Sequence, residues 1–147
     1  MPFTGTVSAL LSQKAPVVHT VTPAHTVFEA IQKMAEYNVG ALVVVQDGKL
    51  KGVISERDYT RKVALKGKTS KETHVSEILT SNVITVTPQT TVEECMRLMT
   101  KHRIRHLPVV ENGQLQGILS IGDLVNWIIT TQNQMIEQLT NYISGQY

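Results

Sequence analysis

The sequence contains one segment twice, and this repeat constrains the fold more than any other feature. Residues 20–58 align with residues 85–123 without a gap, at a constant offset of 65, and about 16 of the 39 aligned pairs are identical. Thr-Val-Thr-Pro opens both copies, and Gly-x-x-Ser-x-x-Asp closes both. A repeat without insertions indicates one structural unit used twice. We expect the two units to pack about a pseudo-twofold axis and to leave clefts that suit ligands.

Length and composition favour a globular chain whose two repeats share a core. The chain has 147 residues, 41% of them hydrophobic and 18% charged, and each repeat alone is near the size at which a core is marginal. The net charge of +2 is too small to indicate nucleic acid or membrane as a partner. The single cysteine excludes an intramolecular disulfide, and no apolar run approaches a membrane span. We therefore expect a soluble, cytoplasmic protein.

Each repeat has the pattern of an α/β (α+β) unit, with a small mixed sheet and two helices. Thr26 with Glu29, and Thr91 with Glu94, have the spacing of helix capping boxes. Short apolar strands are predicted at 41–45 and 106–110, where Pro108 requires an edge or a strand start. Asp-Gly and Asn-Gly hairpin turns follow, and the returning strands are predicted at 50–54 and 115–119.

The predicted organisation is repeat 1 at residues 7–66, a polar linker at 67–74, repeat 2 at 75–130 and a C-terminal helical extension at 131–147. Short helices are expected at 7–11 and 75–79, ahead of the two copies. Beyond repeat 2, apolar residues continue at near-heptad spacing through Ile136, Leu139 and Ile143. This spacing predicts a long helix that packs on the core or on a second chain.

The two Gly-x-x-Ser-x-x-Asp segments allow a structural and a functional interpretation. In the structural one, Gly permits a close backbone approach, Ser caps the following helix, and Asp accepts backbone donors in its first turn. In the functional one, the same carboxylate beside a cleft accepts hydrogen bonds from two sugar hydroxyls. Free backbone donors at the helix start suit a phosphate. Spacing alone leaves both interpretations open.

The ordered set of motifs, twice at one offset, resembles the cystathionine-β-synthase (CBS) domain family in its tandem form, the Bateman module. The resemblance covers about Val7 to Asn126 and rests on Thr-Val-Thr-Pro, the capped helix, residues 104–110 and the two Gly-x-x-Ser-x-x-Asp segments. The whole chain, with its C-terminal helix, is similar to small stand-alone CBS-pair proteins of bacteria and organelles. This family implies clefts that bind AMP, ADP, ATP, NAD or S-adenosylmethionine. The five histidines show no ligand spacing on a common helix face, so we expect no metal cofactor.

The resemblance also implies which residues form the clefts. Asp58 and Asp123 would hold the two riboses, with Ser55 and Ser120 beside them. The walls would come from the opposite repeat, at 14–19 and 39–41 for the Asp123 cleft and at 79–84 and 104–106 for the Asp58 cleft. The candidate ligand-binding residues are Lys14, His19, Val39, Gly40, Ala41, Ser120, Ile121 and Asp123 for one cleft, and Ser55, Arg57, Asp58, Ile84, Ile104, Arg105 and His106 for the other.

The two copies differ where the family places phosphates. Repeat 2 has Arg105 and His106 there, whereas repeat 1 has Gly40 and Ala41, so we expect unequal occupancy of the two clefts. The resemblance implies a homodimer of four repeats, which the C-terminal helix would extend or lock. Two alternatives remain: a ligand-free protein-interaction module, and nucleic-acid binding through the basic series Arg57, Arg61, Lys62, Lys66, Lys68 and Lys71. Catalysis has no evident acid–base or nucleophile pair to support it.

Overall fold

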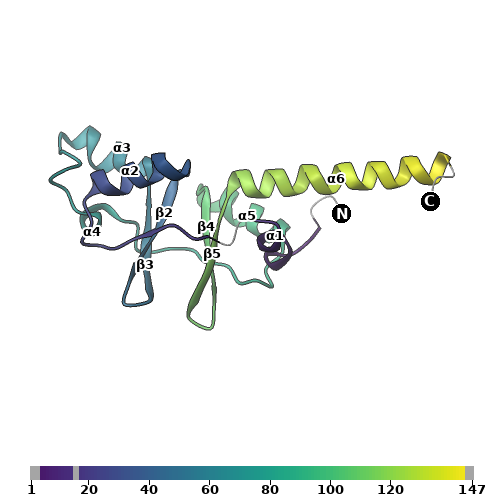
Figure 1. The fold of residues 1–147 in the computed structure, drawn as a ribbon, viewed down its shortest axis with the longest axis horizontal. Coiled ribbons are helices and arrows are strands. Elements are labelled where there is room, and N and C mark those ends of the chain that lie inside the picture. The colour runs from purple at the N-terminus through teal and green to yellow at the C-terminus, as the bar shows by residue number, and fades with distance from the viewer. Residues whose placement is uncertain (1–3, 15–16, 145–147) are drawn as a thin grey trace.

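The computed structural model describes residues 4–14 and 17–144, and it has the mixed α and β composition that the sequence predicts (Figure 1). Each repeat contributes one β-hairpin with helices packed beside it, and a long helix ends the described chain. The elements in order are α1 (Val7–Ser12), β1 (Thr20–Val21), α2 (Val27–Tyr37), β2 (Ala41–Gln46), β3 (Lys49–Ser55), α3 (Glu56–Lys62), the 3-10 turn η1 (Ala64–Lys66), α4 (Val75–Ile78), α5 (Val92–His102), β4 (His106–Glu111), β5 (Gln114–Ser120) and α6 (Ile121–Ser144).

The two repeats differ in how complete their sheets are. In repeat 1, β1 pairs parallel with β2, and β2 pairs antiparallel with β3. In repeat 2, β4 and β5 form the same hairpin, but the parallel partner is reduced to a bridge between Val86 and Val109. The Val86 amide donates to the Pro108 carbonyl over 3.0 Å, so the nitrogen of Pro108 faces this same edge and has no proton to donate. The predicted edge position of Pro108 is thus confirmed.

Turns and helix ends follow the local sequence closely. Asp47 and Gly48 have φ of 53° and 75°, and Asn112 and Gly113 have 52° and 75°, as two-residue hairpin turns of type I′ require. At α2 the predicted capping box is complete, since Thr26 and Glu29 bond each other's backbone N–H. At α5 only the Thr91 half forms, because the Glu94 carboxylate pairs with Arg97 instead.

The hydrophobic core consists of two clusters, each of which is completed by a helix from outside its own repeat. Val7 and Leu10 of α1 lie in the cluster of repeat 2, and Val75 and Ile78 of α4 lie in the cluster of repeat 1. The Val7 amide donates to the Thr90 carbonyl and the Val75 amide to the His25 carbonyl, each over 2.8 Å. The expected single shared core is therefore corrected to two cores joined by exchange of short helices. Neither repeat is a separate packing unit.

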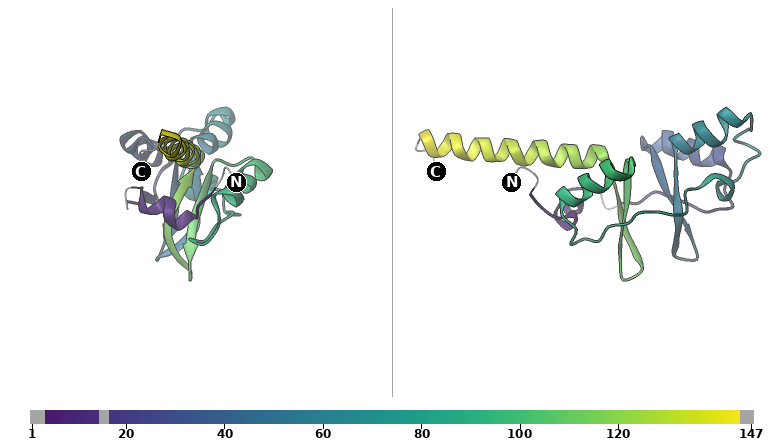
Figure 2. Two further views of the ribbon diagram at one scale, coloured as in Figure 1. Left: turned by 90° about the vertical axis from the view of Figure 1, so that its right-hand side faces the viewer. Right: turned by 180° about the vertical axis from the view of Figure 1, so that it is seen from behind.

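The hairpins stand side by side with their turns on the same side of the molecule, the lower side in Figure 1, and β3 lies against β5. Helix α6 starts inside repeat 2, where Leu124 is fully buried, and it shows no break at the predicted start of the extension at residue 131. The Trp127 indole donates to the Thr4 carbonyl over 2.8 Å. Beyond this anchor α6 projects away from the body (Figure 2). Among the described residues, no helix combines the length and apolar character needed to span a membrane.

Candidate functional site

A cleft of about 1050 Å³ lies between the two repeats. Repeat 1 contributes the end of β3 and the start of α3, and repeat 2 contributes the end of α5, the start of β4 and the extended segment after α4. The lining residues are Gly40, Val53, Ser55, Glu56, Arg57, Asp58, Arg61, Lys62, Thr80, Asn82, Val83, Ile84, Met99, Thr100, His102, Arg103, Ile104, Arg105 and His106. The cleft is large enough for a nucleotide-sized ligand.

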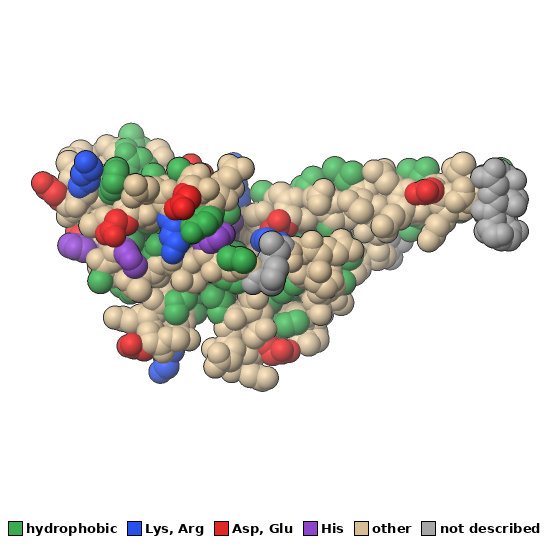
Figure 3. Space-filling view, viewed as in Figure 1, with side chains coloured by type: hydrophobic (Ala, Val, Ile, Leu, Met, Phe, Trp, Pro, Cys, Tyr) green, Lys and Arg blue, Asp and Glu red, His purple; other side chains and the backbone are tan. Residues whose placement is uncertain are grey.

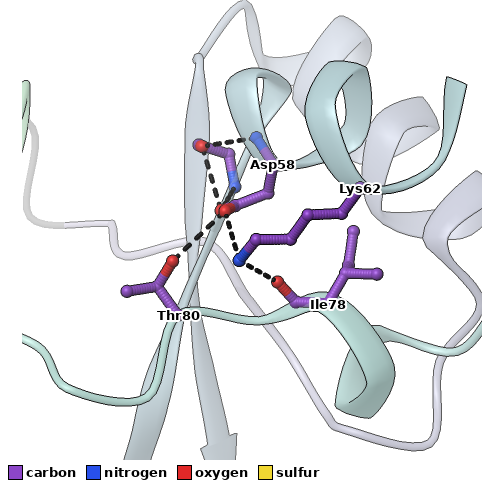
Figure 4. Close-up of polar contacts among 5 residues, drawn as sticks. Asp58, Lys62, Ile78 and Thr80 are labelled. Atoms are coloured by element: carbon purple, nitrogen blue, oxygen red, sulfur yellow. Dashed lines mark hydrogen bonds and ion pairs between the residues drawn. The ribbon is translucent and has the colours of Figure 1, made fainter. Parts of the chain in front are cut away.

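Asp58 lies in this cleft as a nearly buried carboxylate, 9% exposed (Figure 4). Its Oδ2 accepts from the backbone N–H and the hydroxyl of Ser55, at 2.9 and 3.0 Å, and completes the capping box that starts α3. Its Oδ1 lies 3.2 Å from the Thr80 hydroxyl, which donates to it, and 3.0 Å from the Lys62 ammonium. One oxygen therefore holds the helix start, while the other faces side chains that line the cleft.

The segment that carries Thr80 is fixed against the sheet by backbone bonds. Val53 and Thr80 exchange N–H···O bonds of 3.0 and 2.9 Å. This approach requires glycine at position 52, because a Cβ there would lie 2.3 Å from the Thr80 carbonyl oxygen. The glycine of the first Gly-x-x-Ser-x-x-Asp motif thus serves close backbone packing, while its Ser and Asp serve the helix cap. Gly52, Ser55 and Asp58 thus all have the structural roles that the motif suggests. These roles do not use Oδ1 of Asp58, which lies in the cleft.

Positive groups are concentrated along the rest of the cleft. Arg57, Arg61, Lys62, Arg103 and Arg105 line it, together with two histidines. The Arg57 guanidinium donates to the Arg103 carbonyl over 3.0 Å and so connects α3 of repeat 1 to the end of α5 in repeat 2. The cleft surface therefore favours an anionic ligand.

His106 lies at the junction of the two repeats and is largely uncharged. A Cβ added at Gly40 would lie 3.8 Å from its ring, so the imidazole packs against the repeat 1 backbone. Burial lowers the pKa of His106, and the nearby charge of Asp123 opposes this effect only in part. The arginines and Lys62, rather than His106, therefore supply positive charge in the cleft near neutral pH, where Glu56 and Asp58 are the acidic lining residues.

The equivalent carboxylate in repeat 2, Asp123, has different surroundings. The Lys14 ammonium lies 2.7 Å from its Oδ2 and donates to the Ile118 carbonyl over 2.6 Å. Burial raises the pKa of Asp123, but the bonds from Lys14 and from the Ser120 backbone outweigh burial, and the pKa lies below its usual value. A cavity of about 400 Å³ nearby is lined by Lys14, Gly117 and Ile118 but not by Asp123.

The cations that pair with the two aspartates come from different places in the repeat. At the offset of 65, Lys62 corresponds to Trp127, and Lys14 corresponds to Leu79. Asp58 is paired with a lysine one turn further along its own helix, whose side chain is 43% exposed. Asp123 is paired with a lysine from the segment after α1, which is 32% exposed and tightly bonded. The two carboxylates thus differ in their partners and surroundings: Asp123 is the more exposed, at 26% against 12% for the Asp58 side chain, but only Asp58 lines the large cleft.

The structure brings together eight of the candidate residues and separates the others. Those that line the large cleft are Gly40, Ser55, Arg57, Asp58, Ile84, Ile104, Arg105 and His106. Gly40 was expected in the Asp123 cleft, but it lines the cleft of Asp58 because it precedes β2 at the junction with His106. Lys14, Ser120 and Asp123 lie together in repeat 2, whereas the His19 ring stacks on Tyr37 with centroids 3.7 Å apart. Val39 and Ile121 pack against the two cores, and Ala41 is buried. Part of the expected 14–19 wall, residues 15 and 16, lies outside the described residues.

Several cleft residues were not among the sequence candidates. Lys62 and Arg61 follow Asp58 by four and three positions, so the helical period could have placed them beside it. Arg103 and His102 lie at the end of α5, and only the packing of the two repeats brings them to Asp58. The basic residues considered for nucleic-acid binding do not all lie on one surface. Arg57, Arg61 and Lys62 line the cleft, whereas the Lys71 ammonium lies over the Phe28 ring, 4.9 Å from its centroid.

The known proteins that resemble this chain contain CBS domains. The CBS domain family matches residues 7–65 and 75–130. The mitochondrial CBS domain-containing protein CBSX3 of Arabidopsis thaliana is 44% identical over 131 residues, which are 86% of this chain and 64% of that protein, so the chain spans just under two thirds of this relative.

Two solved structures extend the comparison. A CBS-domain protein of Burkholderia ambifaria MC40-6, provisionally described as a signal-transduction protein, has a TM-score of 0.84 and 46% identity, covering 87% of this chain and 96% of that one. A CBS-CP12 protein of bloom-forming cyanobacteria, described as hexameric, has a TM-score of 0.74 and 29% identity. The match covers 83% of this chain and 67% of that one. With two matched domains in one chain and the site between them, the protein belongs to the CBS domain family as a tandem pair.

Proposed function

We propose that this chain is a non-catalytic regulatory module that binds an adenine nucleotide, of the AMP, ADP, ATP or NAD class, in the cleft that contains Asp58. The observation that carries the proposal is the composition of this single cleft. It combines a carboxylate at one side, apolar side chains in its wall and several arginines, contributed by both repeats. These groups match the ribose, the base and the phosphates of a nucleotide.

The ribose diol would bind Oδ1 of Asp58. This oxygen now accepts from Thr80 and pairs with Lys62, so a sugar hydroxyl has to replace the lysine. A sugar hydroxyl in this place forms a hydrogen bond to a charged group, which contributes about 1.5–3 kcal/mol. The Lys62 ammonium, whose side chain is 43% exposed, then becomes free to pair with phosphate.

The base and the phosphates have separate regions of the cleft. Val53, Val83, Ile84 and Ile104 supply apolar surface for a flat ring. Arg57 and Arg105 come from opposite repeats, and bidentate guanidinium groups suit phosphate oxygens. A ligand held in this way contacts both repeats at once.

Such a ligand regulates by changing the balance between two arrangements of the repeats. A ligand shifts a conformational equilibrium only by its difference in affinity for the two states. The bond from Arg57 to the Arg103 carbonyl spans the cleft, and a phosphate that takes Arg57 away breaks it. The proposed active form is a homodimer of four repeats. The hexameric CBS-CP12 relative shows that this fold assembles, and it motivates the proposal that this chain does so too.

The test is titration calorimetry with AMP, ATP and NAD on Asp58→Asn and on the matched variant Asp123→Asn. Asparagine keeps an oxygen for the Ser55 amide, so α3 keeps its cap. For whichever nucleotide binds the natural chain, we expect Asp58→Asn to lower the binding affinity by about tenfold or more, because a charge-assisted bond to the ribose is lost. Asp123→Asn should change the affinity by less than about threefold, within the range of an indirect effect. A larger loss at Asp123 than at Asp58 contradicts the assignment of the cleft.

A further inference from the structure

The second half of α6 has an apolar face that nothing in the described chain covers. Residues 132–140 are all exposed, and α6 runs through them without contact to the body (Figure 2). Six large hydrophobic side chains on this helix are exposed, from 42% at Val125 to 84% at Ile143. Figure 3 shows hydrophobic side chains along the helix where it leaves the body. Most of the stability of helices in proteins comes from packing of the apolar face, so we expect this face to have a partner.

Five of the six exposed hydrophobic residues, together with the polar residue Gln132, form a stripe, and the sixth, Met135, lies beside it. The spacing within the stripe alternates between four and three residues, which is the a/d pattern of a coiled coil. We define the α6 stripe as Val125, Ile129, Gln132, Ile136, Leu139 and Ile143. If Ile129 occupies an a position, Ile136 and Ile143 do so as well, and Val125, Gln132 and Leu139 occupy d. All three a positions are isoleucine and one d position is leucine, and isoleucine at a with leucine at d is the combination that favours two parallel strands.

Charge restricts what can cover this stripe. From Leu124 to Ser144 the sequence contains one ionised side chain, Glu137, and no lysine or arginine. Helices that lie on membranes carry basic residues on their polar face, and nucleic acid requires them too. Glu137 lies about 100° around the helix from Ile136, so two copies of the stripe meet without facing carboxylates. A second copy of the same helix is the occupant that this surface fits.

Gln132 gives the pairing its register. A polar residue at one core position of a coiled coil specifies register and strand number, at a cost in stability. In a parallel pair each Gln132 faces its own copy, and the two amides can bond each other. In a shifted register the amide instead faces the apolar residue Ile129 or Ile136 and loses its partner. The stripe therefore favours one alignment.

We propose that α6 pairs with α6 of a second copy as a parallel, two-stranded coiled coil in register at Gln132. The two bodies then lie at the same end of the pair. Because Asp123 lies in the first turn of the same helix, the pair is continuous with the wall of repeat 2. The inference concerns assembly and does not rest on the nucleotide site.

The test combines two charge variants with analytical ultracentrifugation of the full chain. Ile136→Glu with Leu139→Glu places charges in the stripe, and the control Gln134→Glu with Gln138→Glu adds the same charges on exposed positions outside it. We expect the stripe variant to weaken self-association by about 100-fold or more and the control to keep it, as for loss of a packed interface core. Equal association constants for the two variants overturn the proposal.

Orientation is tested by disulfide formation in Ile143→Cys. The only native cysteine, Cys95, is buried, and burial raises its pKa to about 11, so the natural chain serves as the uncross-linked control. A parallel pair brings the two new thiols together, and mild oxidation should give a linked dimer that the stripe charges abolish. Absence of the link, or binding of the chain to phosphatidylserine vesicles through the stripe in place of self-association, overturns the proposal. Nucleotide calorimetry on the stripe variant reports the other site separately.

Discussion

Gly52→Ala, compared with Gly117→Ala, tests how the wall of the large cleft is built. The two glycines occupy the same position in the two repeats, and neither has a positive φ, so alanine is tolerated by the backbone at both. At position 52 a Cβ would lie 2.3 Å from the Thr80 carbonyl oxygen and 2.6 Å from Leu79 Cδ1. At position 117 the nearest atom is the end of the Leu11 side chain, at 3.1 Å. The same chemical change therefore meets backbone in one repeat and a flexible side chain in the other.

The expected costs follow from these contacts. Overpacking costs about 1–3 kcal/mol, and weakening the two backbone bonds between Val53 and Thr80 adds about 1 kcal/mol. Gly52→Ala should thus lower the free energy of unfolding by about 2–4 kcal/mol, or on the order of 10 °C in Tm. Gly117→Ala should change it by less than about 1 kcal/mol, because Leu11 can move and alanine restricts the unfolded chain.

Urea denaturation followed by circular dichroism measures both variants against the natural chain. The account also predicts that Gly52→Ala weakens nucleotide binding more than Gly117→Ala, because Thr80 and Asp58 share the displaced wall. Equal unfolding free energies for the two variants would refute the reasoning, since they differ only in what the added methyl group meets. So would a Gly52→Ala chain as stable as the natural one.

Two further predictions concern titration. In Lys14→Met, the pKa of Asp123 should rise, because burial is then no longer offset by the ammonium; carbon-13 NMR of the carboxyl group measures it, and an unchanged pKa contradicts the ion pair. Burial lowers the pKa of His106 in the folded chain, so its contribution to stability is full above the unfolded pKa of about 6.5 and declines as the pH falls below it. Between about pH 7.5 and about pH 5.5, the natural chain should therefore lose more stability than His106→Gln, as urea midpoints will show; parallel losses refute this.

Most of the fold follows from local sequence signals that agree with one another. The hairpin turns are specified by Asp-Gly and Asn-Gly, because these pairs tolerate positive φ at both positions. The helix starts are specified by Thr26, Ser55 and Thr91, whose side chains accept the first free amides. Each of these patterns occurs twice at equivalent positions, so the two copies support the same prediction independently.

The exchange of α1 and α4 between the two cores could not be read from the sequence. Both helices show an apolar face, but the pattern does not say which of two similar cores will receive it. The incomplete glutamate half of the second capping box has a similar origin. The Glu94 carboxylate could accept from the Thr91 amide or pair with Arg97, and in the structure it pairs with Arg97.

The candidate site was predictable in its carboxylates and much less so in its cations. Asp58 and Ser55 were identified from one motif and lie together as expected from the helix start. The difference between the two clefts depends on which segment crosses each aspartate. Lys14 was assigned to the Asp123 cleft only through the family resemblance, because a contact over 109 residues leaves no local pattern. The cations beside Asp58 that were missed are Lys62, Arg61 and Arg103.

The most direct test of the central claim is titration calorimetry of the natural chain with AMP, ATP and NAD in turn. The account predicts saturable binding of at least one of them, with the affinity reduced about tenfold or more in Asp58→Asn and changed by less than about threefold in Asp123→Asn. If none of the three ligands gives heat or a shift in Tm, the cleft between the repeats is not a nucleotide site.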